Sequence, residues 1–373
     1  MKVLLLASWG PSLLNFRGNL IQDLLSVGHN VAVCAPEISG TLQARLRKMG
    51  VEAWPVRMQR ARITGASEVR TIVDLWKVLN RVKPHVLLAY TIKPVVYGSI
   101  LAKARNVPSI YCLITGQGSI FHANGLGGKL VRQIVKVLYR ISLKNCHGVF
   151  FQNNDDQRVF INHRLVSPDR TIVVPGSGVN LDHFAFTQIP SGMPCFLMLS
   201  RLLKQKGVME YVEAARIVKK RHPEIRFQLA GPVENSKRGV LKEDIEQWSR
   251  EGVIEYHGFI EDVRSIIESC HIFVLPSYYG EGVPRSVLEA MAIGRPIITT
   301  NTAGCRDTVM NCRNGVIVEP RDAEGLADAM EELMGKPELL KVMGRESRIM
   351  AEELYDVRKV NSIMMEGMGL KQG

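Results

Sequence analysis

The chain lacks the paired cysteines and histidines that mark zinc, disulfide and redox proteins. Its seven cysteines form no Cys-x-x-Cys pair, and its nine histidines include no His-Glu-x-x-His sequence. Scattered cysteines of this kind favour reduced thiols in the cytoplasm. Long apolar runs are also missing, because none approaches the ~18 residues that a membrane-spanning helix needs. We therefore expect a cytoplasmic protein with no metal site built from its own side chains.

Acidic residues are scarce in the first half of the chain. Residues 1–190 contain 23 Lys and Arg against 9 Asp and Glu, whereas residues 191–373 contain 25 against 27. Such asymmetry indicates an anionic partner for the first half, either nucleic acid or an anionic membrane surface. No aromatic-rich strip of the kind that stacks on bases accompanies these cations. We therefore expect the membrane surface as partner, and no nucleic acid.

Short apolar runs alternate with longer helical patterns along the whole chain, which is typical of βαβ units and parallel sheets. One series begins with a predicted strand at Val3–Ala7. It continues with strands at Val31–Ala35, His85–Tyr90, Ser109–Ile114 and Gly148–Gln152, and with a helix near residues 95–105. A second series begins at Cys195–Ser200 and continues with strands at Arg226–Ala230, Ile254–His257, Ile272–Leu275 and Pro296–Thr300. The pattern predicts an α/β protein with two facing, Rossmann-like, doubly wound parallel-sheet domains. A cleft between them would be lined by the carboxyl ends of the strands.

A stretch rich in Pro and Gly between residues 174 and 194 separates the two series. It predicts a first domain over residues 1–185 and a second over residues 192–345.

Two cations follow the first strand of the second series. Arg201 and Lys206 stand five residues apart, just before a predicted helix. A doubly wound domain places a ligand phosphate at this point, where Arg offers a planar fork of donors and Lys a compact charge. Taken alone, the two cations fit a solvated basic loop better.

Two carboxylates eight residues apart, Glu281 and Glu289, occupy a Gly-rich turn and the helix that follows it. The start of a helix offers unpaired N–H groups and a partial positive charge, which suit a phosphate. An ordinary capping turn explains the pair equally well in isolation. Leu229-Ala-Gly231 and Tyr256-His-Gly258-Phe259 also end predicted strands, however, so these segments share one sheet edge. Together they indicate a site for a nucleoside diphosphate that carries a sugar.

The order of these motifs resembles that of the retaining glycosyltransferases of family 4, over essentially the whole chain. The resemblance implies the GT-B architecture, with the donor in the second domain and a final helix over residues 346–373 that crosses back to the first. Residue by residue, it implies roles for eight donor-binding positions. Arg201 and Lys206 would hold the diphosphate, Glu289 the ribose hydroxyls, and the Phe259 and Ile260 backbone the nucleobase; Glu281, Gly282 and Val283 would face the sugar and the β-phosphate.

The departing diphosphate gains negative charge, and cations aimed at that charge are the largest catalytic term to expect. No Asp-x-Asp motif, the metal-binding motif of the other common glycosyltransferase fold, occurs in the chain. We therefore expect Arg201, Lys206 and Glu281 to be the catalytic residues of a retaining reaction without metal or cofactor. Glu281 would orient the sugar.

The first half resembles a bacterial subgroup that transfers a hexose or N-acetylhexosamine from a UDP-sugar to undecaprenyl-diphosphate-linked saccharides. The similarity lies in Ser8-Trp-Gly10, in Tyr90-Thr-Ile-Lys93 and in Thr115-Gly116-Gln-Gly118. It implies a polyprenyl-diphosphate-linked acceptor. Gly10 and Gly116 are interpreted as positions where a side chain would block the donor, although a turn requirement explains either glycine equally well. Many family members carry a histidine where residues 115–118 lie; without it, the departing phosphate oxygen can take the acceptor proton.

Residues 129–144 form a basic amphipathic helix. Lys129, Arg132, Lys136 and Arg140 recur at spacings of three and four, with Leu130, Ile134, Leu138 and Ile141 beside them. Such a helix can lie on an anionic bilayer, and it can equally pack its apolar side chains into the domain core. The charge of the first half favours the bilayer. Three further cations, Arg17, Arg60 and Lys93, are assigned to the acceptor or the membrane.

The hypothesis is therefore a peripheral enzyme on the inner face of the cell membrane that assembles surface polysaccharide or glycan. Two alternatives remain open. A UDP-sugar 2-epimerase shares the architecture but needs groups for proton transfer in the cleft. A transferase with a soluble acceptor would leave the basic helix with a structural role alone.

Overall fold

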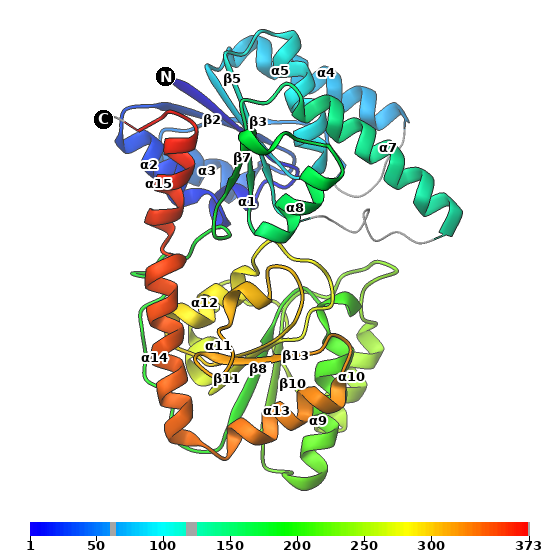
Figure 1. Cartoon of the computed structure of the whole chain (residues 1–373), viewed down its shortest axis with the longest axis vertical. Helices are drawn as coiled ribbons and strands as arrows, with labels where there is room; N and C mark the ends of the chain where they lie inside the picture. Colours follow the sequence, from blue (N-terminus) through cyan, green and yellow to red (C-terminus); the bar gives the residue numbers. More distant parts are fainter. Residues whose placement is uncertain (60–64, 117–124, 372–373) are drawn as a thin grey trace. The chain divides into compact units, whose positions relative to one another are not determined.

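The protein forms two α/β units in a computed structural model that describes residues 1–59, 65–116 and 125–371. Unit 1 combines Met1–Ser177 with Val357–Gly373, and unit 2 spans Gly178–Asp356. Figure 1 shows a parallel sheet with helices on its faces in each unit. Each unit is described by itself below.

Unit 1 contains a seven-stranded parallel sheet with the order β3-β2-β1-β4-β5-β6-β7. The strands are β1 (Lys2–Leu6), β2 (Asn30–Ala35), β3 (Glu52–Pro55), β4 (Val86–Tyr90), β5 (Ser109–Ile114), β6 (Gly148–Phe151) and β7 (Thr171–Val173). Successive side chains of a strand point to opposite faces. In β1, accordingly, Leu4 and Leu6 enter one hydrophobic core while Val3 and Leu5 enter the other.

Helices cover both faces of this sheet. The face with Leu4 and Leu6 packs against α4, α7 and α8, and the opposite face against α2, α3 and α15. The helical segments of unit 1 are α1 (Ser12–Asn15), α2 (Gly18–Ser26), α3 (Gly40–Lys48), α4 (Gly65–Val82), the π-helix η1 (Pro94–Gly98), α5 (Ser99–Ala104), α7 (Gly125–Leu143), α8 (Asn154–Asn162), the 3₁₀ turn η2 (Pro168–Arg170) and α15 (Val357–Gly367).

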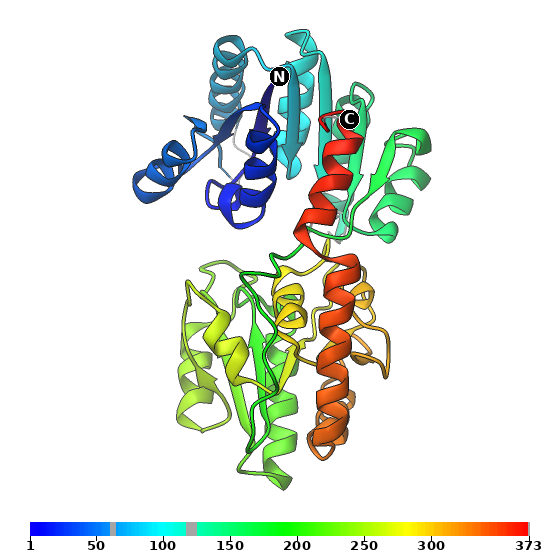
Figure 2. The same ribbon diagram turned by 90° about the vertical axis from the view of Figure 1, so that its left-hand side faces the viewer.

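The last helix, α15, joins unit 1 although it follows all of unit 2 in the sequence. It packs against α2, and Figures 1 and 2 show it lying along unit 1. Val360, Met364 and Met365 enter the core, and Asn361 donates a hydrogen bond of 2.7 Å to Asp23. The α15 segment is therefore part of the unit 1 core.

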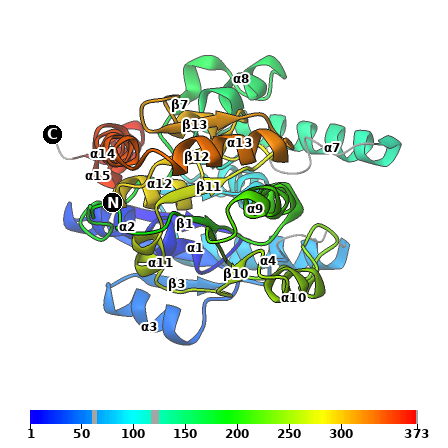
Figure 3. The ribbon, with the colours of Figure 1, turned by 90° about the horizontal axis from the view of Figure 1, so that it is seen from below.

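Unit 2 contains a six-stranded parallel sheet with the order β10-β9-β8-β11-β12-β13. Its strands are β8 (Cys195–Leu199), β9 (Arg226–Ala230), β10 (Glu255–Tyr256), β11 (Ile272–Leu275), β12 (Ile297–Thr300) and β13 (Gly315–Val318). Figure 3 shows α9 and α13 side by side over this sheet, in agreement with their contacts. The helical segments are η3 (Lys204–Lys206), α9 (Val208–Arg221), α10 (Lys242–Arg250), α11 (Arg264–Ser269), α12 (Arg285–Ile293), η4 (Arg306–Thr308), α13 (Ala323–Met334) and α14 (Pro337–Leu354).

A fully buried arginine fastens the segment that enters unit 2. The guanidinium of Arg295 donates hydrogen bonds to Thr187 Oγ1 at 2.7 Å and to the Thr187 carbonyl at 3.0 Å. It also donates to the carbonyls of Ile267 and Glu268, each at 3.1 Å. Burial lowers the pKa of Arg295 from its usual value. The surrounding carbonyl oxygens accept hydrogen bonds from the buried guanidinium and so stabilise its positive charge. Arg295 thereby connects the segment around Thr187 to the end of α11.

Replacing Arg295 by methionine is expected to lower the free energy of unfolding of unit 2 by about 3 kcal/mol or more, because the buried carbonyls lose their donors. Chemical denaturation of the full chain measures this loss. The matched control is Arg345→Met at an exposed position of α14, with a change within about 0.5 kcal/mol. Equal effects of the two substitutions would show that the Arg295 contacts do not stabilise unit 2.

Candidate functional site

A left-handed glycine brings Lys206 to the end of β11. Gly207 has a φ of +81° between η3 and α9, and a Cβ there would lie 2.1 Å from the Pro276 carbonyl oxygen. Only glycine allows this close approach. The 3₁₀ turn of Lys206 therefore packs directly against the segment that leaves β11. The two cations predicted from the sequence, Arg201 and Lys206, lie on either side of the same short loop after β8.

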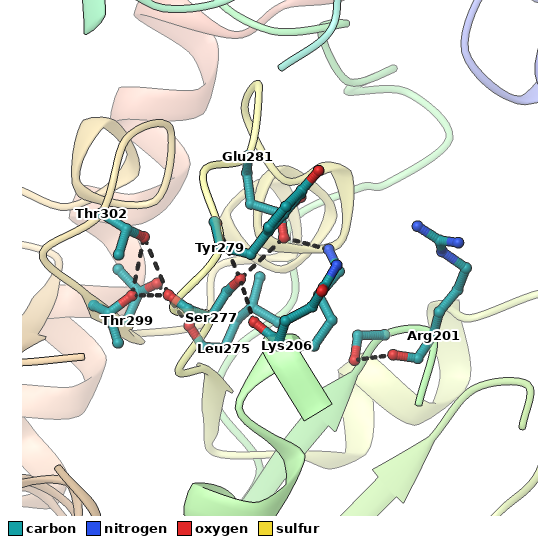
Figure 4. Close-up of polar contacts among 11 residues, drawn as sticks. Arg201, Lys206, Leu275, Ser277, Tyr279, Glu281, Thr299 and Thr302 are labelled. Carbon is teal, nitrogen blue, oxygen red and sulfur yellow. Dashed lines mark hydrogen bonds and ion pairs between the residues drawn. The ribbon is translucent and has the colours of Figure 1, made fainter. Parts of the chain in front are cut away.

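Lys206 and Glu281 form a mostly buried ion pair at the carboxyl edge of the unit 2 sheet (Figure 4). The Lys206 ammonium donates to the Glu281 carboxylate, and the Ser277 hydroxyl donates to the same oxygen at 3.1 Å. Each charged side chain is only 14% exposed. At this burial the attraction is stronger than in water, and removing one partner leaves a costly charge. The predicted catalytic residues Lys206 and Glu281 are thus held together.

The end of β12 and the loop after it hold the Ser277 and Glu281 segments in place. The hydroxyls of Thr300 and Thr302 both donate to the Ser277 carbonyl, the second at 3.1 Å. Gly304 has a φ of +75°, and a Cβ there would lie 2.0 Å from the Gly282 carbonyl oxygen. The loop after β12 therefore lies against the Glu281–Gly282 turn, where Val283 is buried.

Arg201 lies beside the network and pairs with a different carboxylate. Its Nη1 is 3.1 Å from Glu234 Oε1, and both side chains are substantially exposed, 45% for Arg201 and 33% for Glu234. An exposed pair of this kind is worth little, so Arg201 can exchange Glu234 for another anion at low cost. The two predicted cations therefore differ: Lys206 is fixed by a buried partner, whereas Arg201 faces solvent.

Glu289 lies on α12, two turns beyond Glu281. Arg285 Nε donates to Glu289 Oε1 at 3.0 Å, and Arg285 Nη1 donates to the Gly178 carbonyl at 2.9 Å. Burial raises the pKa of Glu289, while the charge and hydrogen bond of Arg285 lower it in part. Arg285 thus holds one oxygen of the carboxylate and ties it to the first residues of unit 2.

The turn after β10 carries the predicted contact to a nucleobase. Phe259 is 72% exposed, and Ile260 is half-buried. A large aromatic ring that is exposed to this degree offers a stacking surface next to the backbone that was assigned to the base.

The remaining predicted donor residues belong to unit 1. A Cβ at Gly10 would lie 2.6 Å from the Pro36 carbonyl oxygen, and Gly116 has a φ of +125°. Packing against this backbone accounts for a glycine at Gly10. The positive φ, which favours glycine, accounts for the one at Gly116, and the donor contacts of both residues stay predictions. Both follow the carboxyl ends of their strands, β1 and β5.

Two cations assigned to the acceptor or the membrane are buried in unit 1. Arg17 is 2% exposed and lies over the Tyr90 ring, 5.6 Å from its centroid. Lys93 is buried, and its ammonium is 2.6 Å from the Glu68 carboxylate. Because neither side chain reaches the surface, neither contributes to an exposed membrane contact. Arg60 and the neighbouring Arg62 lie outside the described residues, as do Gln117 and Gly118 of the loop that lacks a histidine.

The four remaining cations of that prediction, Lys129, Arg132, Lys136 and Arg140, recur along α7. Lys129 is exposed, and Arg140 donates to the carbonyls of His163 and Arg164, each at 3.2 Å. The last cation of the basic stripe therefore contacts the turn that follows α8.

Two site residues were not predicted, Ser277 and Arg285. Ser277 is the second residue after β11, just as Arg201 is the second residue after β8, and this topological parallel would have revealed it. Arg285 stands four residues before Glu289, the spacing at which opposite charges meet on a helix.

No group of metal-ligating side chains occurs in the described parts of the chain, residues 1–59, 65–116 and 125–371. Over the same residues, the helices are too short or too polar to cross a bilayer.

Two family models match the chain, one for each unit. Residues 2–153 match the Glycosyl transferase 4-like family, and residues 180–350 match Glycosyl transferases group 1. Each match falls within one parallel α/β unit. The protein is therefore a glycosyltransferase, and the resemblance to family 4 is confirmed.

Two bacterial glycosyltransferases are similar to most of the chain. The chain is 27% identical over 347 residues to a N,N'-diacetylbacillosaminyl-diphospho-undecaprenol alpha-1,3-N-acetylgalactosaminyltransferase of Campylobacter jejuni, covering 90% of this chain and 89% of that protein. It is 25% identical over 296 residues to a UDP-Gal:alpha-D-GlcNAc-diphosphoundecaprenol alpha-1,3-galactosyltransferase of Escherichia coli, covering 75% and 74%.

Solved structures share the fold. HepE of Anabaena, in complex with UDP and glucose, superposes with a TM-score of 0.81 at 17% identity, over 99% of both chains. A sucrose-phosphate synthase of Thermosynechococcus elongatus gives 0.81 at 16% identity, over 98% of both chains. The predicted fold class, two Rossmann-like units of the GT-B kind, is confirmed.

The contrast between the two ion pairs can be measured by double-mutant cycles. For Lys206→Met and Glu281→Gln, the coupling free energy is expected to be about 1–3 kcal/mol, because each single variant leaves its partner buried. For Arg201→Met and Glu234→Gln, the exposed control pair, it is expected to stay below about 1 kcal/mol. Chemical denaturation of the four single and two double variants gives both values, and equal coupling would contradict the assigned burial.

Proposed function

We propose that the enzyme transfers a hexose or N-acetylhexosamine from a UDP-sugar to a lipid-diphosphate-linked saccharide, with retention at the anomeric carbon and without a metal. The observation that carries this proposal is the Lys206–Glu281 pair with Arg201 beside it, at the sheet edge where a doubly wound domain binds phosphates. The activities for which both relatives are named support the choice of acceptor, since each involves a sugar linked to diphospho-undecaprenol. The enzyme would act on the inner face of the cell membrane, in the assembly of surface polysaccharide or glycan.

The two cations divide the work on the donor diphosphate. Arg201 exchanges the exposed Glu234 for a phosphate oxygen, and its planar fork suits two oxygens at once. Lys206, held by Glu281, presents a fixed charge to the oxygen that leaves the sugar. Because it is already oriented, little reorganisation is needed as negative charge develops.

The two carboxylates serve different parts of the donor. Glu281 remains paired with Lys206 and orients sugar hydroxyls, and an acid–base role for it is not required. Glu289 accepts hydrogen bonds from the ribose hydroxyls. In a front-face reaction the departing phosphate oxygen takes the proton of the acceptor hydroxyl, so retention needs no side-chain base.

The reaction is tested by a screen of nucleotide sugars with a polyprenyl-diphosphate-linked acceptor. Arg201→Ala and Lys206→Ala are each expected to lower kcat/KM by about a hundredfold or more, because each removes a cation from the leaving group. The matched control is Lys204→Ala, an exposed cation of the same 3₁₀ turn, with little effect expected. Epimer formation from a UDP-sugar alone, or equal transfer to soluble acceptors, would overturn the proposal. Chelation should leave the rate unchanged, and proton NMR of the product should show a retained anomeric configuration.

The role of Glu289 predicts a pH dependence of donor binding. Ribose hydroxyls donate to the ionised carboxylate, and burial raises the pKa of Glu289. Lowering the pH therefore protonates Glu289 earlier than an ordinary glutamate, and the affinity for UDP falls. We expect the ratio of wild-type to Glu289→Gln affinity, measured by calorimetry, to rise with pH. The same ratio for Glu224→Gln, an exposed glutamate of unit 2, should stay flat. A flat ratio for both variants would contradict the role of Glu289.

A further inference from the structure

Helix α12 begins with a cation, Arg285, that does not favour the helix. The start of a helix carries a partial positive charge, which repels a cation in the first turn. Arg285 is the first residue of α12, and the first turn contains no acidic side chain. Arg285 pairs with Glu289 four residues further on, and a cation that precedes its glutamate is the less favourable order for such a pair. The stability of α12 therefore does not account for an arginine at this position.

The guanidinium of Arg285 contacts one oxygen of Glu289 and one backbone carbonyl. Its Nε donates to Glu289 Oε1 at 3.0 Å, whereas its Nη1 donates to the Gly178 carbonyl at 2.9 Å. The pair is therefore not bidentate. Within residues 1–59, 65–116 and 125–371, no hydrogen bond reaches the second oxygen, Oε2, and 15% of the Glu289 side chain is exposed. One oxygen of Glu289 is thus held, and the other is open to a ligand.

The backbone that anchors Arg285 is itself fixed. Gly178 is the first residue of unit 2 and has a φ of +68°. The N–H of the next residue, Val179, donates to the Tyr355 carbonyl at 2.7 Å. The Gly178 carbonyl is therefore a firm anchor for the guanidinium. Because Arg285 is tied to this carbonyl, it holds Glu289 in one orientation.

We infer that Arg285 is the positioning residue through which Glu289 recognises the ribose of the donor nucleotide. The inference rests on the proposed function, in which Glu289 accepts hydrogen bonds from the ribose hydroxyls. A ribose offers two neighbouring hydroxyls, and a carboxylate accepts from both only when its oxygens are turned towards them. Arg285 occupies one lone pair of Oε1 and leaves Oε2 and the rest of Oε1 to the ribose. Arg285 acts through Glu289 and need not touch the nucleotide.

The charge of Arg285 also acts on the ionisation of Glu289. Burial raises the pKa of Glu289, and the charge and hydrogen bond of Arg285 lower it in part. A second cation, Arg348 of α14, contacts α12 at the Ala292 carbonyl, near the other end of the helix, and pairs with Glu352. Arg285 therefore helps to keep Glu289 in the ionised form, which accepts hydrogen bonds at both oxygens.

The test compares the binding of UDP and 2′-deoxy-UDP to the full chain by calorimetry. The wild type is expected to prefer UDP about tenfold or more, because the 2′-hydroxyl donates to a charged acceptor. Arg285→Met should lose most of this preference. Arg285→Lys, which keeps the charge without the planar fork, should give an intermediate value. Added to Glu289→Gln, the Arg285→Met substitution should have no further effect on the preference, because Arg285 acts through Glu289.

The matched control is Arg348→Met. The side chain of Arg348 is 18% exposed, as is that of Arg285, and it too pairs with a glutamate four residues further on. It also donates to backbone carbonyls, those of Phe184 at 3.0 Å and Ala292 at 2.8 Å. Its loss should destabilise unit 2 as the loss of a well-bonded arginine does, and the preference for UDP should remain that of the wild type.

The pH profile of UDP binding separates positioning from a purely structural role. Without Arg285, the pKa of Glu289 rises further, because burial is then opposed less. On acidification, the affinity of Arg285→Met for UDP should therefore begin to fall at a higher pH than that of the wild type. Arg285→Lys should show a smaller shift, and Arg348→Met should follow the wild-type profile.

Either an unchanged preference for UDP or an unchanged pH profile in Arg285→Met would overturn the inference. Equal binding of the two nucleotides by the wild type would do the same. In these cases the proposed function stands or falls separately, by sugar transfer with the wild type. A wild type that neither binds UDP nor transfers a sugar from it would overturn the proposed function and this inference with it. If Arg285→Met does not fold, Arg285→Lys decides, and wild-type values for it would contradict the inference.

Discussion

The parallel direction of all strands is the constraint on which the rest of the structure depends. It carries the chain back across the sheet after every strand, so each unit collects its functional loops at one edge. In unit 2 this edge joins Arg201, Lys206, Ser277 and Glu281 from loops up to about eighty positions apart. Two glycines in left-handed conformation, Gly207 and Gly304, then let the loops approach closely enough for the charges to meet. The side chains of the candidate site are thus placed by topology first and by hydrogen bonds second.

The types of residue in the candidate site could be predicted from the sequence, because strand ends and helix starts are visible as patterns. Their pairing could not. Nothing in the spacing shows that Lys206 binds Glu281 while Arg201 binds Glu234, since this depends on how closely three loops pack. The same limit applies to α7: the sequence shows a basic stripe beside apolar residues. Which apolar residues are buried depends on the sheet behind the helix.

The central strands were predicted to within about two residues, because buried parallel strands form continuous apolar runs. Three strands escaped prediction: β3, β7 and β13. All three lie at the edge of a sheet, are only three or four residues long and are partly exposed, and β3 ends in Pro55. Edge strands need few apolar residues and tolerate proline, so their sequences differ little from those of loops. The π-helix η1 was likewise predicted only as part of a regular helix.

The position of α15 in the sequence determines the order in which the two units can be completed during synthesis of the chain. Unit 1 is discontinuous: its sheet is translated first, whereas α15 leaves the ribosome only after all of unit 2. Val360, Met364 and Met365 are fully or almost fully buried, so until they arrive the sheet face beside α2 remains open to solvent. Domains of a nascent chain generally fold as they emerge. Here the unit that is made first is completed last, and unit 2 can close before its neighbour has a finished core.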